Sequence, residues 1–367
     1  MATQSPYPDT LANETNLPDV VQFVDTYDAE HMNMVRAFIR DMTAEIGVNP
    51  SGNKTTLVER LAVSLDNDGK LIWPEQIVTV ASSGGHFNTI QSAIDSISDA
   101  AVNKPYTVLI YPGLYTETVT LKDHVNLAGF DKHNTQLLNS SFMGVALTIP
   151  ADAHNKISNM TLNTTGPMSK SILMNGATLD VMNCHLTGVN RCMNVEAGTT
   201  NIFGCTFSGD QGAISNSADN VICNIYNSCF TMGSHLFVFQ GDAQVNIYNC
   251  HGMGSMIQVN TGSCGIRNCS FVTTSFTVTL NTAAMRITNS HLQAGGDNPA
   301  LKLMAQSANI VVSNSVLLKS GSAAESVYAY YENTPCSIAL CSMNAGLHAN
   351  CVNQIADPCN VLDANLN

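Results

Sequence analysis

A short phrase, apolar-x-Asn-(Cys/Ser)-x-(Leu/Phe), returns about every 22 residues through the C-terminal two-thirds of the chain. A repeat of this length is typical of a solenoid, in which each coil buries its apolar face only against its neighbours. The central positions, called the pivot residues below, are separated by 24, 21, 23, 22, 19, 21 and 25 residues and are Asn159, Asn183, Gly204, Asn227, Asn249, Asn268, Asn289 and Asn314.

The coils are expected to consist of strands. Each copy is short, rich in Ile, Val, Phe and Thr, and alternates apolar with polar residues before a turn residue. Residues 136–327 contain no run at helical spacing, and the Leu-x-x-Leu-x-Leu core of leucine-rich repeats is absent. The pattern predicts a mainly β fold: a right-handed parallel β-helix of about nine or ten coils with a short N-terminal α-helical segment.

Because strands of successive coils stack about 4.8 Å apart, equivalent side chains should form columns. Asn tolerates the left-handed backbone of a tight corner, and stacked amides can bond to one another. We therefore predict one internal ladder, with neighbours about 5 Å apart, formed by Asn183, Asn227, Asn249, Asn268, Asn289 and Asn314.

The next position forms a column of small residues: Cys184, Cys205, Ser228, Cys250, Cys269, Ser290 and Ser315. The chain has 12 cysteines, and their spacing follows the coils. Stacked strands hold Cβ atoms further apart than the ~3.8 Å that a disulfide prefers, so buried, reduced thiols are expected. No Cys-x-x-Cys or Cys-x-x-His pair occurs, so neither a metal nor another cofactor is expected.

Composition excludes several classes of function. The net charge of −13 argues against nucleic acid and against an anionic membrane surface. The chain has no stretch of eighteen apolar residues, which a membrane-spanning helix would need. The N-terminus lacks the basic and apolar regions of a signal peptide.

Three regions are expected. Residues 1–75 form a helical docking or oligomerisation segment, residues 76–335 form the β-helix, and residues 336–367 form a C-terminal cap or tail. Within the first region, Asp19–Gly47 has a helical pattern, and either a short coiled coil or an amphipathic cap fits it. Its apolar stripe, predicted to contact other copies or a particle, is Val35, Phe38, Ile39, Met42 and Ile46.

The β-helix is expected to begin at Val78, followed by a helix over residues 88–97 whose N-terminus is capped by Asn88 and Gln91. This helix should close the first coil, which would otherwise expose its core. Four strands should follow, at residues 107–111, 112–117, 119–121 and 125–129.

This opening resembles the pectinesterase branch of the pectin-lyase-like β-helix superfamily. The matching pieces are a Gly-x-Phe-x-Thr-Ile-Gln-x-Ala-Ile-Asp helix at residues 84–97, an Ile-x-Pro-Gly-x-Tyr-x-Glu strand at residues 110–117 and a Val-x-Leu-x-Gly strand at residues 125–129. The match extends to Phe207 and then fades into generic coils.

The resemblance implies an ester hydrolase, but its catalytic motifs are missing. The Gln-Ala-Val-Ala-Leu string is replaced by residues 170–174, Gln-Asp-Thr-Leu by residues 189–193, and Asp-Phe-Ile-Phe-Gly by residues 212–216. Only Asp210 lies near the nucleophile position, and the single tryptophan, Trp73, precedes the coils. We therefore expect no catalysis by this route, which needs two carboxylates and oxyanion donors together.

One acidic column remains a candidate for glycan or ion binding: Glu196, Asp219 and Asp242, each 23 residues apart. The simpler interpretation is a corner, since corners recruit Asp, Asn and Gly. A second column contains His185, His251 and His291, which are not in adjacent coils and so are expected to be a polar outward row.

Residues 28–61 resemble a linker in tailed-bacteriophage virion proteins. The matching strings are Asp-Ala-Glu-His-Met-Asn at residues 28–33, Glu-Ile-Gly-Val-Asn-Pro-Ser-Gly at residues 45–52 and Leu-Val-Glu-Arg-Leu at residues 57–61. The resemblance implies a virion protein, a homotrimer bound to other virion proteins, placed as a capsid decoration (cement) protein or as a tailspike or fibre. The missing catalytic motifs predict that its role there is structural and non-catalytic. Host surface polysaccharide is a further candidate partner, and the rival prediction is a tailspike enzyme that cleaves or de-esterifies it.

Overall fold

The computed structural model describes residues 76–216, 219–275, 278–280, 284–303 and 310–319, shorter strand segments up to residue 361, and Ala37. The chain divides into two units, Met1–Trp73 and Pro74–Asn367. The predicted apolar stripe of the N-terminal segment (Val35, Phe38, Ile39, Met42 and Ile46) lies outside the described residues.

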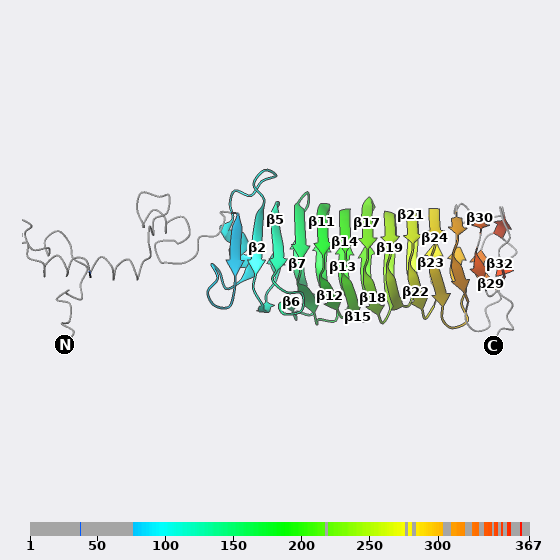
Figure 1. The fold of residues 1–367 in the computed structure, drawn as a ribbon, viewed down its shortest axis with the longest axis horizontal. Helices are drawn as coiled ribbons and strands as arrows, with labels where there is room; N and C mark the ends of the chain where they lie inside the picture. The colour runs from blue at the N-terminus through cyan, green and yellow to red at the C-terminus, as the bar shows by residue number, and fades with distance from the viewer. Residues whose placement is uncertain are drawn as a thin grey trace, which may run out of the picture. The chain divides into compact units, whose positions relative to one another are not determined.

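The second unit is a parallel β-solenoid of about nine turns with one short helix, which confirms the predicted fold class. Strands of successive coils lie side by side (Figure 1) and form three faces. The first face ends at the pivot residues and contains β1 (Ile77–Val80), β2 (Tyr106–Ile110), β5 (Val125–Gly129), β8 (His154–Ser158), β11 (Ala177–Met182), β14 (Gly198–Phe203), β17 (Val221–Tyr226), β24 (Ala284–Thr288), β27 (Ile310–Ser313), β30 (Thr334–Ala339) and β33 (Cys351–Asn353).

The second face follows the pivot residues and contains β3 (Gly113–Thr116), β6 (Thr135–Asn139), β9 (Thr161–Thr164), β12 (His185–Gly188), β15 (Thr206–Gly209), β18 (Cys229–Met232), β20 (His251–Gly254), β22 (Ser270–Thr273), β25 (His291–Ala294), β28 (Val316–Leu318), β31 (Ser342–Met343) and β34 (Asn360–Val361). The third contains β4 (Val119–Thr120), β7 (Val145–Ile149), β10 (Lys170–Met174), β13 (Arg191–Val195), β16 (Gly212–Asn216), β23 (Val278–Leu280), β26 (Leu301–Leu303), β29 (Glu325–Ala329) and β32 (Gly346–Leu347). Two long strands, β19 (His235–Tyr248) and β21 (Ile257–Arg267), run through the third face into the first.

The core lies between the faces and is built by alternation along each strand. In β17, for example, Val221, Cys223 and Ile225 are buried while the residues between them are not. Aromatic rings fill the middle coils: Phe207 stacks on Phe230 with centroids 4.8 Å apart, and Phe230 meets Phe237 edge-on at 4.8 Å. Columns of like side chains therefore supply much of the packing between coils.

The short helix α3 (Ile90–Ser96) contacts β1, β2 and β4, and it buries Ile90, Ala93 and Ile94. Its N-cap is Thr89, whose side chain accepts a hydrogen bond from the Ser92 N–H; the predicted cap of Asn88 with Gln91 was wrong by one residue. No helix among the described residues is long and apolar enough to cross a membrane.

The first free N–H groups of α3 are satisfied by a distant side chain. The Glu117 carboxylate, which follows β3, accepts hydrogen bonds from the N–H groups of Ile90 and Gln91 at 2.8 and 2.9 Å. A negative charge at a helix N-terminus is favourable, so this contact fixes the helix against the first coil.

Candidate functional site

The corner between the first and second faces is made by the pivot residues. Each pivot has a left-handed backbone, with φ between 48° and 61° at all eight positions. This conformation costs most residues energy, and Asn and Gly adopt it most readily. The repeated Asn is therefore explained first by backbone geometry.

The pivot side chains also bond to one another. The Asn183 amide donates to Asn159 Oδ1 at 2.9 Å, and the same contact joins Asn249 to Asn227, Asn268 to Asn249, and Asn289 to Asn268 at 3.1–3.2 Å. The ladder is exposed, however, so its predicted internal position was wrong. The left-handed corner turns the Asn side chain outward and places the next residue inside.

That next residue belongs to the buried Cys/Ser column. Each described thiol or hydroxyl in it donates to the backbone carbonyl two residues earlier, as Cys269 does to Arg267 O at 3.1 Å. It also accepts the N–H of the equivalent residue in the preceding coil, as Ser290 Oγ does from Cys269 at 3.2 Å. The column therefore satisfies a buried N–H at each of these corners.

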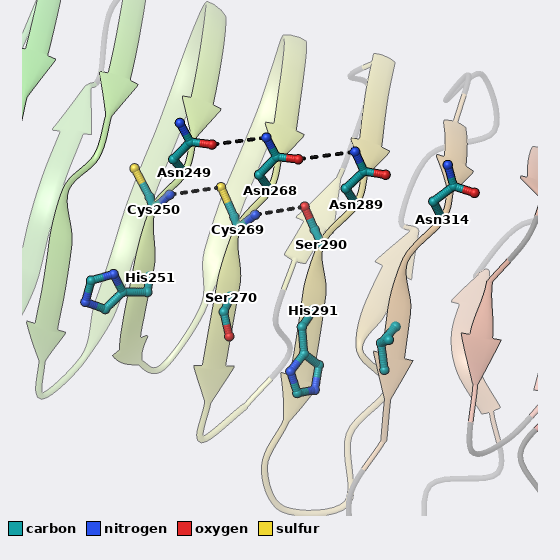
Figure 2. A pocket seen from close by; sticks show the side chains of 11 residues that line it. Asn249, Cys250, His251, Asn268, Cys269, Ser270, Asn289, Ser290, His291 and Asn314 are labelled. Carbon is teal, nitrogen blue, oxygen red and sulfur yellow. Dashed lines mark hydrogen bonds between the residues drawn. The ribbon is translucent and has the colours of Figure 1, made fainter.

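Beside the ladder lies an open groove of about 580 Å³ on the second face. Figure 2 shows the amides along one side of the groove and the His251, Ser270 and His291 column on the other. In the groove, Asn249, Asn268 and Asn289 each use one amide N–H for a neighbour, which leaves a second N–H available to an outside acceptor. The Nε2 atom of His291 is buried and has no hydrogen-bond partner within the described residues.

The acidic column is a corner rather than a shared site. The Glu196 carboxylate accepts a hydrogen bond from the Asn194 amide at 2.8 Å, and Asp219 Oδ1 accepts one from the Asp242 backbone N–H at 2.8 Å. The register changes at this corner, because Asn216 pairs with Phe239, 23 residues later, whereas Val221 pairs with Ala243, 22 residues later. Asp219 and Asp242 therefore meet at a corner where the register shifts by one residue, and the bond between them joins a carboxylate to a backbone N–H.

The remaining acid, Asp210, lies exposed between β15 and β16, and its backbone N–H bonds to Gly188 O. It does not belong to any described group of three or more acidic, His or Cys side chains close enough to hold a metal.

The histidines of the predicted outward row are separated as expected: β12, β15, β18, β20, β22 and β25 pair in order, with His185, His251 and His291 never in adjacent coils. Among the described residues, one group could hold a metal: Asp123, His124 and His154, at the start of the solenoid. The sequence analysis did not find it.

A second amide ladder was also missed. On the outward side of the first face, Asn201 donates to Asp180, Asn224 to Asn201, and Asn246 to Asn224, each at 2.9 Å. The signal was present in the sequence, because these residues stand three positions before successive pivots.

Beside this second ladder is an aromatic column, one position before each pivot. Phe203 stacks on Tyr226, and Tyr226 on Tyr248, with centroids 4.9 and 5.0 Å apart. The Arg267 guanidinium lies 5.6 Å from the Tyr248 ring centroid and ends the described stack. The ring faces are used within the column, so mainly ring edges are left for a partner.

Eight cysteines of the described coils are free thiols: Cys184, Cys192, Cys205, Cys223, Cys229, Cys250, Cys264 and Cys269. Burial raises the pKa of the Cys192, Cys223 and Cys264 thiols to about 12. A thiol that stays protonated is a poor nucleophile, so these three residues are structural.

No protein-family model and no curated protein sequence matches this chain. Among solved structures, the ORF18 protein of Geobacillus virus E2 is 13% identical with a TM-score of 0.48, covering 78% of this chain and 61% of that one. Pectin methylesterase from carrot is 11% identical (TM-score 0.41, 78% and 89% covered), and the A-module of the Azotobacter vinelandii mannuronan C-5 epimerase AlgE4 is 14% identical (TM-score 0.43, 74% and 92% covered). This chain thus spans under two thirds of the viral protein, and the likeness in each case is one of fold.

Proposed function

We propose that this chain is a non-catalytic structural protein of a tailed-bacteriophage particle, displayed on the surface as a capsid decoration protein or as a tailspike or fibre. The observation that carries the proposal is the chemistry of the coils where a pectinesterase would hold its acids. There β13 presents residues 191–195 and β16 presents residues 212–216, and neither strand contains a carboxylate.

The acids nearby have structural tasks. Glu196 accepts the amide of Asn194, and Asp219 caps a backbone N–H of the next coil. Ester hydrolysis of this type needs a carboxylate nucleophile, a second carboxylate and oxyanion donors aimed at one point. Strands β13 and β16 contain no carboxylate that could serve as that nucleophile.

The resemblance of residues 28–61 to virion linkers supports the assignment to a phage particle. These residues lie in the segment proposed to attach the chain to its own copies and to other virion proteins. On the solenoid, the groove beside the pivot ladder offers repeated amide donors to the hydroxyls of a host polysaccharide. Homotrimeric assembly follows from the same resemblance.

The rival function is a polysaccharide-cleaving tailspike. It is favoured by a hollow of about 350 Å³ lined by Asp242, Asn220, Gln244 and Ser263, next to Asp219 on the neighbouring coil. Glycan hydrolysis uses a pair of carboxylates that flank the scissile bond.

Two assays separate these functions. The purified full chain is incubated with methyl-esterified pectin and with surface polysaccharide from the phage host, while methanol and new reducing ends are measured. We expect neither product, and we expect immunogold against the chain to label purified particles. Methanol release abolished by Asp210→Ala, or reducing ends lost in Asp219→Asn and Asp242→Asn but kept in Asp210→Asn, would establish an enzyme instead.

A further inference from the structure

Two histidines meet at the corner that precedes β5 and β8. These strands pair in parallel with Leu127 opposite Ile157, so His124 stands opposite His154 one coil away. Their rings are stacked, with centroids 5.6 Å apart and planes 16° from parallel. His124 also has a left-handed backbone, with φ of 57°.

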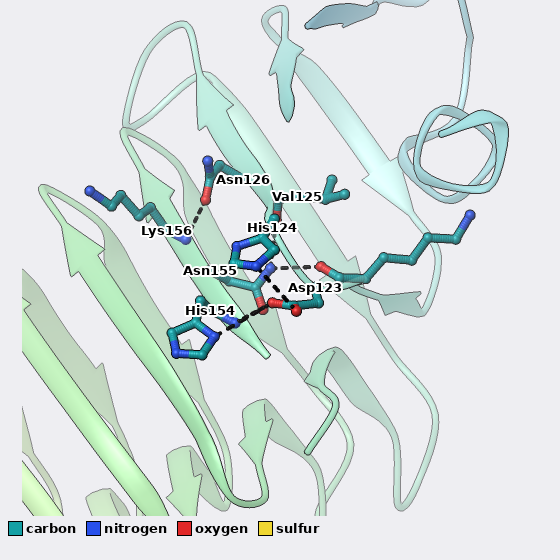
Figure 3. Close-up of polar contacts among 8 residues, drawn as sticks. Asp123, His124, Val125, Asn126, His154, Asn155 and Lys156 are labelled. Carbon is teal, nitrogen blue, oxygen red and sulfur yellow. Dashed lines mark hydrogen bonds and ion pairs between the residues drawn. The ribbon is translucent and has the colours of Figure 1, made fainter. Parts of the chain in front are cut away.

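Asp123 lies against both rings (Figure 3). Its Oδ2 is 3.4 Å from His124 Nε2, and its Oδ1 is 3.7 Å from His154 Nδ1. Taken together, one ligand atom from each of the three residues lies within 4.8 Å of the others. The Oδ1 atom also accepts the backbone N–H of His154 at 2.8 Å, which holds the carboxylate in place.

A fourth polar atom lies here without a partner. Asn155 is 3% exposed, and its amide nitrogen donates to Lys122 O at 2.8 Å and to Val125 O at 2.7 Å. Both amide hydrogens are thus used, so the amide cannot be reversed without losing them. Its oxygen is buried and accepts no hydrogen bond from the described residues. Figure 3 shows the Asn155 side chain next to the Asp123 carboxylate.

We propose that Asp123, His124, His154 and Asn155 bind a divalent first-row transition metal ion, with Zn²⁺ as the representative. Two imidazole nitrogens with carboxylate and amide oxygens are the mixed donors that such ions take, whereas Ca²⁺ and Mg²⁺ prefer oxygen alone. A cation also supplies what the site lacks, which is a positive partner for two neighbouring acceptor oxygens.

The distances agree with this assignment. Zinc ligands at about 2.0–2.2 Å stand roughly 3.3–3.6 Å apart in a tetrahedron, and the two Asp–His separations, each to a different oxygen of the carboxylate, are 3.4 and 3.7 Å. The His–His separation, which is within 4.8 Å, would shorten on rotation of the His154 side chain, which is 62% exposed. An ion at this corner would link residues 30 positions apart and clip the β5 coil to the β8 coil.

A purely structural role for Asp123 explains less. As a cap for the His154 N–H it needs one oxygen, and it leaves the Asn155 oxygen without a partner. Metal binding accounts for all four groups together.

The test uses the full chain without an affinity tag, freed of metal by a chelator that is then removed. Zn²⁺ binding is measured by calorimetry at pH 7.5, and the Zn²⁺-induced rise in Tm by circular dichroism. The variants are His154→Gln and Asp123→Asn, and the matched control is His251→Gln, another exposed histidine at a strand start. Circular dichroism without metal checks that each variant is folded.

We expect both site variants to weaken one Zn²⁺ site at least tenfold and to abolish the Tm rise, with His251→Gln unchanged and Mg²⁺ without effect. The proposal is overturned if Zn²⁺ binds the site variants as tightly as the wild-type chain. It is equally overturned if 1 mM Zn²⁺ neither binds nor shifts Tm, since two imidazoles and a carboxylate in place should bind well below that concentration.

Discussion

Replacing Asn268 separates the two reasons why Asn occupies the pivot. Its backbone φ is 52°, its amide donates to Asn249 Oδ1 at 3.1 Å, and its Oδ1 accepts from Asn289 at 3.2 Å. Alanine removes both hydrogen bonds and leaves a Cβ residue in the left-handed region. Glycine removes the same bonds but fits the backbone.

The magnitudes follow from these two contributions. Each exposed ladder bond should be worth about 0.5–1 kcal/mol, the low end for a net hydrogen bond. The left-handed backbone costs a Cβ-bearing residue such as Ala roughly 1–2 kcal/mol. Asn268→Ala should therefore lower the free energy of unfolding by about 2–4 kcal/mol, and Asn268→Gly by about 1–2 kcal/mol.

Gly204 is the natural control, because it is the pivot residue without a ladder side chain. A Cβ built there meets nothing within 4 Å, although its φ is 61°. Gly204→Asn should recover ladder contacts with Asn183 and Asn227 and leave stability unchanged or raised by up to about 1 kcal/mol. Gly204→Ala should lower it by about 1–2 kcal/mol.

The measurement is urea unfolding followed by far- and near-UV circular dichroism, with coincident curves required before a free energy is taken. If Asn268→Ala and Asn268→Gly were equally destabilising, the backbone argument would fail. If Gly204→Asn cost as much as Gly204→Ala, the ladder bonds would contribute nothing to stability.

Two further predictions concern the thiols and the N-terminal segment. The thiols of Cys192, Cys223 and Cys264 have a pKa raised by burial from 9.0 to about 12, so the folded chain binds more protons than the unfolded one between these values. These groups should not change the stability with pH below about pH 9, and the free energy of unfolding should fall as the pH rises from 9 to 12. Iodoacetamide at pH 8 should leave all three thiols unlabelled in native protein, which peptide mass spectrometry checks. Deleting residues 1–75 should leave a folded solenoid that no longer joins particles, and Phe38→Asp should weaken incorporation because burying an unpaired carboxylate costs several kcal/mol. Normal incorporation of the truncated chain would move the attachment surface to the solenoid or to residues 336–367.

Local rules account for what the sequence alone could predict. The parallel solenoid follows from a phrase repeated at coil length, and the left-handed pivots follow from the backbone preference of Asn and Gly. The buried Cys/Ser column follows from its place next to the pivot. All three depend on residues close together in the chain.

The tertiary structure decided what depends on the lengths of the coils and on the direction of side chains. The pivot amides proved exposed because the corner turns them outward, and the register shifts by one residue between the β16–β19 and β17–β19 pairs. His124 and His154 lie in coils offset by 30 residues, outside the repeating phrase, so their juxtaposition could not be counted from the pivots. The local sequence determines the backbone conformation of each coil. A site shared by two coils depends in addition on the register between them, which is set by packing.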